Sequence, residues 1–376
     1  MPFKIDVLMP TKSQYEVLHH FARKLYEAFK RQGAVCRLLS GDERLYACLR
    51  DPPDFTIGFN GAIKMEDESF FCDHIRVPHV SCLVDPPFRF LELTKSPFMI
   101  ITCDDQEGCQ LLKGKDFNRT VFFPHAVEKE LNFDISKERI YDLVFLGTCI
   151  DPEARKKLWK DRFPPDIYGF MQKAVDIGLH EGPISFMTPL LKHLDPEEYQ
   201  EVFEEVEVYI KGVDRVRLLK AFPDRPVHIF GSNIKEWRNV LKTDENIIVH
   251  DPVSYEEAIA VMQQSKIVLN SSIKNKLGAH ERIFTGMACG AVVVTNDNPW
   301  LREYFEDGKE LLLFNSKTLN GLAKKVNLLL RDEEKIQAIA FAGRAKSIDW
   351  HTWDARVERL LLEISPMLKK MKRSNN

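Results

Sequence analysis

The sequence predicts an α/β protein of two Rossmann-like domains in tandem, each built around a parallel sheet. Short apolar or β-branched runs alternate with helical patterns along both halves of the chain, which is the rhythm of βαβ units. The 376 residues are enough for two domains with separate cores. Glycine and short polar side chains recur directly after the runs, at the sheet edge where open parallel sheets bind ligands.

The first half of the chain predicts an N-terminal domain over residues 1–138. An amphipathic helix is expected over 13–31, because apolar residues recur at every fourth position from Val17 to Phe29. The expected strands are KIDVLMP (4–10), AVCRLL (34–39), FTIGFN (55–60), HVSCLV (79–84), FMIITC (98–103) and TVFFP (120–124).

The second half predicts a C-terminal domain over residues 139–348, after the charged segment VEKELNFDISKERI. Residues 152–222 carry helical patterns with few β-branched runs, and the closing segment 349–376 is also expected to be helical. The expected strands are YDLVFLGT (141–148), PVHIFGS (226–232), NIIVH (246–250), KIVLNSS (266–272), AVVVTN (291–296) and ELLLF (310–314).

Composition narrows the class of protein. A hydrophobic content of 44% and a charged content of 29% are typical of globular chains, and a net charge of −3 argues against a nucleic-acid partner. The longest apolar runs are too short to span a bilayer, and the N-terminus lacks the pattern of a signal peptide. We therefore expect a cytoplasmic protein, with at most peripheral contact with the inner membrane through the basic end KKMKRSNN.

Cysteine usage predicts reduced thiols and no metal centre. The eight cysteines are scattered, with neither a C-x-x-C pair nor metal-ligand spacing. That pattern is typical of a chain in a reducing compartment.

Polar residues follow several strands of the second half. Gly147 and Thr148 end YDLVFLGT, and Arg155 and Lys157 lie shortly beyond. Glycine lets a backbone approach a ligand closely, and cations at this distance could neutralise a diphosphate. A solvated basic helix face explains the same cations and stays open as the alternative.

Three more strands of this half also end in polar residues or are followed by them. VHIFGSN contains Gly231, Tyr255 follows NIIVH, and Ser271 and Ser272 end KIVLNSS. Because the carboxyl ends of parallel strands share one edge, these residues predict a binding edge.

The stretch GAHERIFTGMACGAVVVTN is the strongest candidate for a binding site. Its loop GAH (278–280) precedes a predicted helix over 281–289, whose free N–H groups and positive dipole end form an anion site. Glu281 and Thr285 are four apart and share a face of this helix. Alternatively, Glu281 only favours the helix dipole.

The same stretch carries a resemblance to a known family. The segments RIFTGMACGAVVVTN, NPWLREYFEDGKELLLF and AGRAKSIDWHTWDARVERLL resemble the nucleotide-sugar-binding domain of group 1 glycosyltransferases of GT-B fold, in particular the CgeB-like branch. YDLVFLGT is similar to the first strand of that domain, and SCLVDPPF and PHAV are similar to parts of the N-terminal domain. The resemblance, which spans most of residues 79–362, implies two Rossmann-like domains facing a cleft and a last helix that returns to the N-terminal domain.

This resemblance implies transfer of a sugar from a nucleotide-diphospho-sugar, expected to be UDP- or GDP-linked. Such enzymes usually retain the anomeric configuration and use no metal ion or other cofactor. The leaving diphosphate develops charge that preorganised donors and cations stabilise best. The expected donor contacts are Gly147, Thr148, Arg155, Lys157, Gly231, Tyr255, Ser271, Ser272, Gly278, Ala279, Arg282 and Thr285.

Three residues are expected to act in catalysis. His280 and Glu281 stand on the donor side, and Asp85, at a strand exit before two prolines, is expected to act as a base or to orient the acceptor. A turn-forming Asp-Pro remains the alternative for Asp85. Thr285 stands where the family usually places a Glu on the ribose hydroxyls, so Glu281 is expected to take a ribose or sugar hydroxyl instead.

Other interpretations stay open at this point. A non-hydrolysing nucleotide-sugar epimerase shares the fold, and Thr285 favours a nucleotide-sugar-binding protein that has lost turnover. The acceptor is a glycan, a lipid-linked sugar or a protein. The apolar stripe of the last helix, which begins at Trp353, predicts either packing on the N-terminal domain or the face of a homodimer.

Overall fold

The chain was analysed as a computed structural model, which describes residues 2–131, 133–134, 137–180, 185–241 and 246–373. It divides into two compact units, Met1–Glu130 with Ile348–Asn376 (unit 1) and Leu131–Ser347 (unit 2).

The division falls earlier in the chain than the sequence boundary at 138/139. The Arg139 guanidinium donates hydrogen bonds to the carbonyls of Met262, Ser265 and Cys289, all in unit 2. These bonds tie the segment after Glu130 to unit 2.

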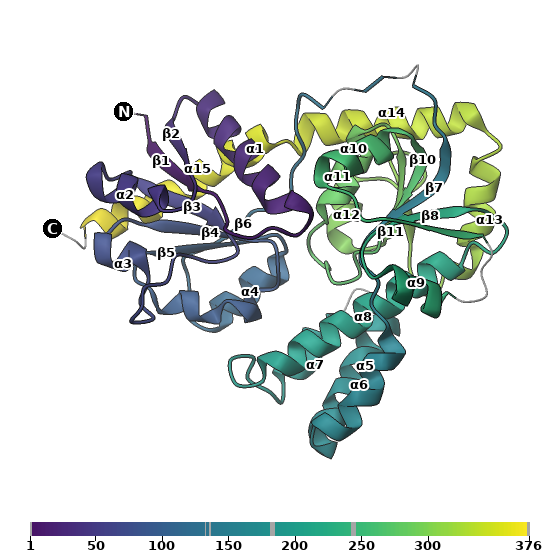
Figure 1. Cartoon of the computed structure of the whole chain (residues 1–376), viewed down its shortest axis with the longest axis horizontal. Coiled ribbons are helices and arrows are strands. Elements are labelled where there is room, and N and C mark those ends of the chain that lie inside the picture. The colour runs from purple at the N-terminus through teal and green to yellow at the C-terminus, as the bar shows by residue number, and fades with distance from the viewer. Residues whose placement is uncertain (1, 132, 135–136, 181–184, 242–245, 374–376) are drawn as a thin grey trace. The chain divides into compact units, whose positions relative to one another are not determined.

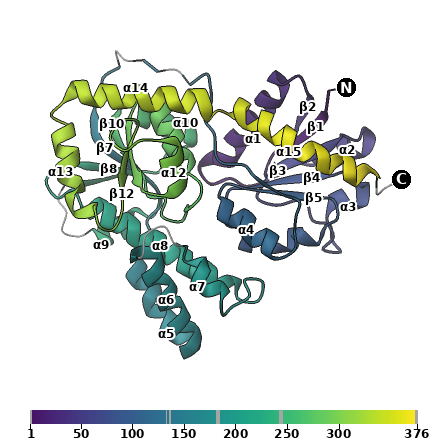
Figure 2. The same cartoon turned by 180° about the vertical axis from the view of Figure 1, so that it is seen from behind.

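Unit 1 is built on a parallel six-stranded sheet in the order β2-β1-β3-β4-β5-β6 (Figures 1 and 2). Every residue of β3, β4 and β5 is buried, as expected for strands covered on both faces. The strands are β1 Lys4–Leu8, β2 Val35–Leu39, β3 Phe55–Phe59, β4 His79–Leu83, β5 Met99–Cys103 and β6 Thr120–Phe122. The helices are η1 Gln14–Glu16, α1 Val17–Arg31, α2 Glu43–Arg50, α3 Phe71–Ile75, η2 Pro87–Arg89, η3 Leu91–Lys95, α4 Gln106–Gly114 and α15 Trp353–Arg373.

The last helix, α15, packs against α1 within unit 1. The Trp353 ring lies 5.3 Å from the Phe21 ring and 6.3 Å from the Phe59 ring. The Arg356 guanidinium donates to the carbonyls of Pro124 and His125. The apolar stripe of α15 is therefore covered by unit 1 and does not form a free dimer face.

Unit 2 is built on a second parallel six-stranded sheet, in the order β12-β11-β10-β7-β8-β9 (Figure 1). Its strands are β7 Tyr141–Leu146, β8 Val227–Phe230, β9 Ile247–His250, β10 Ser265–Leu269, β11 Val292–Asn296 and β12 Leu312–Phe314. Its helices beside the sheet are α9 Ile234–Val240, α10 Tyr255–Gln263, α11 Glu281–Ala288, α12 Pro299–Tyr304, α13 Leu319–Leu329 and α14 Glu333–Trp350.

A helical arm is inserted between β7 and β8. It consists of α5 Pro152–Arg162, α6 Pro165–His180, α7 Met187–Leu191 and α8 Gln200–Lys220, and it extends away from the sheet of unit 2 in both views (Figures 1 and 2). Helices α5 and α6 each pack on α8. Trp159 of α5 is buried against the ring of Tyr209 of α8. The predicted helical segment 152–222 thus has a small apolar core of its own.

The predicted fold class is confirmed. Each strand expected from the sequence occurs, and both sheets are parallel throughout. The helix expected over 13–31 begins only at Val17, because Tyr15 and Glu16 adopt left-handed backbone conformations with φ of 55° and 61°.

Candidate active site

The strand order of unit 2 locates its ligand-binding crevice. From β7 the strand order runs to one edge of the sheet through β8 and β9, and from β10 it runs to the other edge through β11 and β12. The place between β7 and β10 is therefore a topological switch point, where open α/β sheets bind ligands outside the carboxyl ends of the strands. The side chain of Arg282 reaches this point, because its Nη1 donates to the Leu146 carbonyl at the end of β7 over 2.6 Å. Arg282 therefore fixes the N-terminal turn of α11 to the carboxyl end of β7.

Three consecutive residues form an ionic cluster at this place. His280 caps α11, and its Nε2 accepts from Arg282 Nη2 over 2.9 Å. The other ring nitrogen, Nδ1, lies 3.4 Å from the Arg282 amide nitrogen and 2.5 Å from Glu281 Oε2. Arg282 Nε is 3.5 Å from the other carboxylate oxygen. The carboxylate of Glu281 is thus held between an imidazole and a guanidinium, and its side chain is largely buried.

The loop that leads into this cluster is held by α12. Asn298 Nδ2 donates to the carbonyls of Gly278, over 3.0 Å, and of Asn275, over 2.9 Å. Ala279 is fully buried, backbone included, so this structure does not expose it to a ligand. Asn298 therefore fixes two backbone carbonyls of this loop.

The side chains of Thr285 and Tyr255 contact each other. Their hydroxyl oxygens are 3.1 Å apart, Thr285 is completely buried, and Tyr255 is 5% exposed. The pair joins α10 to α11 inside unit 2. Neither residue is exposed in this structure, and the contacts with a donor expected from the sequence stay predictions.

Ser271 and Ser272 also hold the scaffold together. Ser271 Oγ donates to Asp214 of α8 over 2.6 Å, and the Ser272 amide donates to Asn296 Oδ1 over 2.7 Å. Both serines are buried. Burial raises the pKa of the Asp214 carboxyl, and hydrogen bonds from Ser271 and Asn296 oppose this shift. The two serines therefore connect β10, β11 and α8, and their contacts with a donor stay predictions.

The glycines after β7 and β8 are explained by close packing. A Cβ on Gly231 would lie 1.9 Å from the Gly147 carbonyl oxygen. Thr148 and Ser232, the next residues along, share a hydroxyl hydrogen bond of 3.0 Å. Gly231 is therefore required for the two strand ends to meet, whether or not a ligand binds there.

The predicted cations of α5 lie on the helical arm. Arg155 Nη1 is 2.8 Å from Glu205 of α8, so its charge is matched inside the arm. Lys157 is exposed on the same helix. The structure thus favours the alternative of a solvated basic face over a role in binding a diphosphate.

Asp85 lies in unit 1, after β4, where it pairs with the residue after β3. Its Oδ2 accepts from Asn60 Nδ2 over 2.9 Å, and Asn60 Oδ1 accepts from the Val84 amide over 3.0 Å. Asn60 has a φ of 51°, a left-handed conformation that Asn tolerates better than most residues. The carboxylate is therefore positioned at the carboxyl edge of the unit 1 sheet.

A second polar pair lies at this edge, and of its two residues only His125 is a candidate from the sequence, with less weight than Asp85. His125 Nε2 is 3.3 Å from Asp104 Oδ2, and both side chains are buried. Asp104 directly follows β5, and His125 lies shortly after β6. The charged residue directly after a strand is the feature of the sequence that could have indicated this pair. By contrast His79 is sealed in the core between Thr56 and the Gly61 carbonyl, where burial lowers its pKa to about 4.

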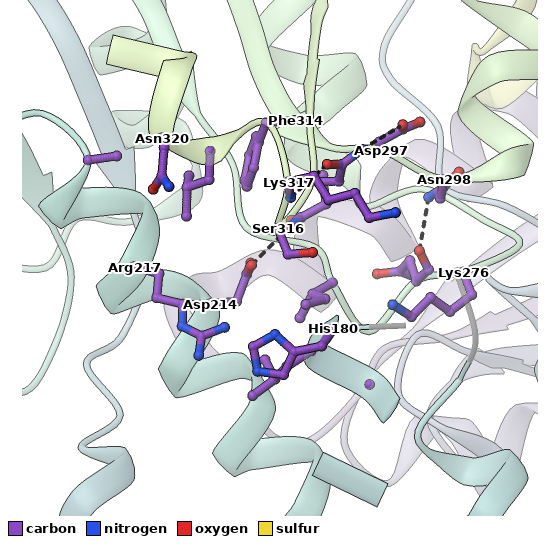
Figure 3. Close-up of a pocket in the computed structure, with 18 of the residues that line it drawn as sticks. His180, Asp214, Arg217, Lys276, Asp297, Asn298, Phe314, Ser316, Lys317 and Asn320 are labelled. Carbon is purple, nitrogen blue, oxygen red and sulfur yellow. Dashed lines mark hydrogen bonds between the residues drawn. The ribbon is translucent and has the colours of Figure 1, made fainter. Parts of the chain in front are cut away.

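A large cavity, also not predicted, opens beside the switch point. It has a volume of 1320 Å³ and lies between the loops that follow β10, β11 and β12 and the arm helices α6 and α8 (Figure 3). Basic side chains from both walls enter it, among them Arg217, Lys276 and Lys317. The polar run Asn296-Asp297-Asn298, at the end of β11, is the feature of the sequence that could have indicated a binding site here.

Residues 214–362 match a protein-family model described as glycosyl transferase-like. None of the curated proteins matches the sequence. Among the described residues, no helix has the length and apolar character of a membrane span, and in the same part of the chain no three His, Cys, Asp or Glu side chains are grouped to hold a metal ion.

Solved structures share the fold along almost the whole chain. Anabaena HepE in complex with UDP-glucose aligns with a TM-score of 0.56 at 13% identity, covering 97% of this chain and 100% of that one. Sucrose-phosphate synthase from Thermosynechococcus elongatus aligns with a TM-score of 0.59 at 9% identity, covering 97% and 99%. AviGT4, a glycosyltransferase involved in Avilamycin A biosynthesis, aligns with a TM-score of 0.57 at 11% identity, covering 98% and 99%.

At these identities the structural likeness shows the fold alone, which is that of GT-B glycosyltransferases. The family match over 214–362, together with this fold, confirms the enzyme class expected from the sequence, a glycosyltransferase. The CgeB-like branch stays a prediction.

Proposed function

We propose that the protein transfers a sugar from a nucleoside-diphosphate sugar to an acceptor, with the donor diphosphate held at the switch point of unit 2. The observation that supports this most is the position of Arg282, whose guanidinium links the N-terminus of α11 to the end of β7. Helix N-termini and guanidinium groups are both suited to anionic phosphate oxygens.

The cluster supplies the groups that departure of a nucleoside diphosphate needs. Arg282 offers a fixed positive charge, and the N-terminus of α11 offers backbone N–H donors next to it. Glu281 orients His280 through Nδ1 and is placed to accept a donor hydroxyl. Since these groups carry the charge, we propose a metal-independent reaction, with retention of anomeric configuration as in the family that the sequence resembles.

We propose that the acceptor hydroxyl is handled by unit 1. Asp85 is fixed by Asn60 at the carboxyl edge of that sheet, and a fixed carboxylate can orient or deprotonate a hydroxyl. The acceptor class remains that expected from the sequence, a glycan, a lipid-linked sugar or a protein. The CgeB-like branch and a cytoplasmic location belong to the same proposal.

The donor is tested first by ligand-dependent melting of the purified protein. UDP-, GDP-, dTDP-, ADP- and CMP-sugars are screened, and the true donor raises the melting temperature by mass action. Release of nucleoside diphosphate from that donor is then measured. An epimerase would change the sugar without releasing nucleoside diphosphate, so the assay separates the two activities.

The site is tested by replacing Arg282. For Arg282→Ala we expect a loss of about 100-fold or more in release of nucleoside diphosphate, the typical effect of removing a preorganised donor. Arg282→Lys keeps the charge but not the planar fork, and is expected to recover only part of the rate. Arg359→Ala, which removes an exposed arginine of α15, is the control. Full turnover in folded Arg282→Ala would refute the assignment.

A further inference from the structure

We propose that the 1320 Å³ cavity of unit 2 is a second ligand site, separate from the donor site, which binds an anionic saccharide carrying phosphate or carboxylate groups. The cavity is lined by the arm helices α6 and α8 on one side and by the loops after β10, β11 and β12 on the other (Figure 3).

The charges in the cavity favour an anion. Arg217 and Lys220 are exposed on α8, and Lys317 is exposed on the opposite wall. Within the described part of the chain, none of the three lies within ion-pair distance of a carboxylate. Because they come from two separate walls, they are not simply one solvated helix face. A hollow lined by like charges concentrates oppositely charged ligands.

The two carboxylates of the cavity are already occupied. Asp297 makes a two-pronged pair with Arg302, with distances of 2.6 and 2.7 Å. Asp214 accepts hydrogen bonds from Ser271 and Asn296, over 2.6 and 3.0 Å. The charge of Asp297 is therefore matched by Arg302, and Asp214 is buried beneath the lining. Arg217, Lys220 and Lys317 thus leave the accessible lining positive.

Size and lining favour a saccharide over a simple ion. A volume of 1320 Å³ exceeds the roughly 300–1,000 Å³ of drug-sized pockets. Val216, Ile273 and Leu319, which are partly exposed, supply apolar surface for the flat faces of sugar rings. Ser316 and Asn320 supply exposed hydrogen-bonding groups for hydroxyls. Such a mixture of apolar faces and polar groups around positive charge suits a sugar bearing anionic substituents.

The position of the cavity separates it from the donor crevice. The switch point lies between β7 and β10, whereas the cavity lies over the ends of β11 and β12, on the side of the arm. None of His280, Glu281 and Arg282 lines it. Asn298 nevertheless belongs to its lining and bonds the Gly278 carbonyl. A ligand in the cavity would therefore contact the residue that holds the donor loop.

The test compares binding of four probes by calorimetry: tetragalacturonate, glucose 1-phosphate, the neutral maltotetraose and UDP. We expect tetragalacturonate or glucose 1-phosphate, the two anionic saccharide probes, to bind, and maltotetraose to bind about tenfold more weakly or not at all. In the variant Arg217→Gln/Lys220→Gln/Lys317→Gln, binding of that anionic probe should weaken by about tenfold or more, because three exposed charge contacts together amount to one or two factors of ten.

The control variant is Lys160→Gln/Lys173→Gln/Lys335→Gln. It removes the same charge at exposed positions outside the cavity and should bind all probes as the wild type does. The affinity for UDP should be equal in all three proteins. A loss of UDP binding in the cavity variant would make the cavity part of the donor site and overturn the proposal. So would equal binding of charged and neutral probes, or no binding of either anionic probe.

Two sources of the ligand are separated by turnover with the donor. If the bound probe gains one sugar by mass spectrometry, the cavity holds the acceptor. If the probe is unchanged but alters the rate of nucleoside diphosphate release, the cavity holds an effector. The binding measurements do not depend on turnover. The cavity proposal can therefore fail while the proposed sugar transfer holds, and the sugar transfer can fail while the cavity still binds the probe.

Discussion

At the residue scale, the position of Thr285 shows how a motif can be kept while its role changes. In the resembled family a Glu at this position is expected to bind ribose. Here the hydroxyl is fully buried and bonded to Tyr255. A Glu at this position would place its carboxylate where no water reaches. The presence of Thr in place of Glu therefore affects packing as well as ligand binding.

This interpretation predicts that Thr285→Glu destabilises the protein instead of restoring a ribose contact. Burying a carboxylate without a matched cation is expected to lower the free energy of unfolding by about 3 kcal/mol or more. Thr285→Ser, which keeps the hydroxyl for Tyr255, is the control and should stay close to wild type. Both are measured by denaturant unfolding. A stable Thr285→Glu protein with tighter donor binding would show that the family role is still accessible.

At the element scale, the meeting of β7 and β8 depends on one glycine. A Cβ on Gly231 would overlap the carbonyl oxygen of Gly147, a backbone atom that cannot move without shifting β7. The sequence suggested a ligand contact for both glycines, because glycine permits close approach of any kind. Only the structure shows that the approaching group is another strand.

Gly231→Ala is therefore expected to destabilise unit 2 by at least about 2 kcal/mol, as overpacking against backbone does. The matched control is Gly169→Ala in α6, where a Cβ would meet nothing within 4 Å. That change should leave stability equal or raise it by up to ~1 kcal/mol, because Ala is the better helix former. Thermal and denaturant unfolding of the two variants provide the comparison. A neutral Gly231→Ala would refute the packing explanation.

The strands are the part of the fold that can be predicted best from the sequence. Buried parallel strands such as β11 read as uninterrupted β-branched runs, and a local pattern suffices to find them. Burial of single polar side chains could not be found in the same way. Hydroxyl side chains next to such runs have the same sequence pattern whether they bind a ligand or are buried, as with Ser271, Ser272 and Thr285. Only the packing of α8 and α10 shows that these hydroxyls are buried in this structure.

The candidate site was predicted in part for a physical reason. Residues 278–282 are contiguous, so loop, helix N-terminus and cluster follow from local sequence. The cavity unites α6, α8 and loops after three strands, which are far apart in the sequence. No window of residues carries that information, and the arm that closes the cavity was visible only as a helical segment.

At the scale of the whole molecule, the chain crosses from unit 1 to unit 2 and back. Residues Ile348–Asn376 belong to unit 1, although they begin in the last turn of α14, the last helix beside the unit 2 sheet. Unit 1 is therefore completed by a distant part of the chain, whereas unit 2 is one continuous stretch. For unit 1 this contribution is α15, whose first residue, Trp353, is 2% exposed and packs on the Phe21, Phe59 and Phe123 rings.

This connection predicts a local effect of Trp353→Ala. Removing the ring is expected to lower the stability of unit 1 by about 3–5 kcal/mol, the usual range for a buried aromatic. Hydrogen exchange resolved by peptide should show faster exchange in β1, β3 and α1, while the strands of unit 2 keep their protection. Leu362→Ala is the control, because that side chain of α15 is 71% exposed and should change neither unit. Equal loss of protection in both units would mean that α15 stabilises the chain as one cooperative body and not through the core of unit 1.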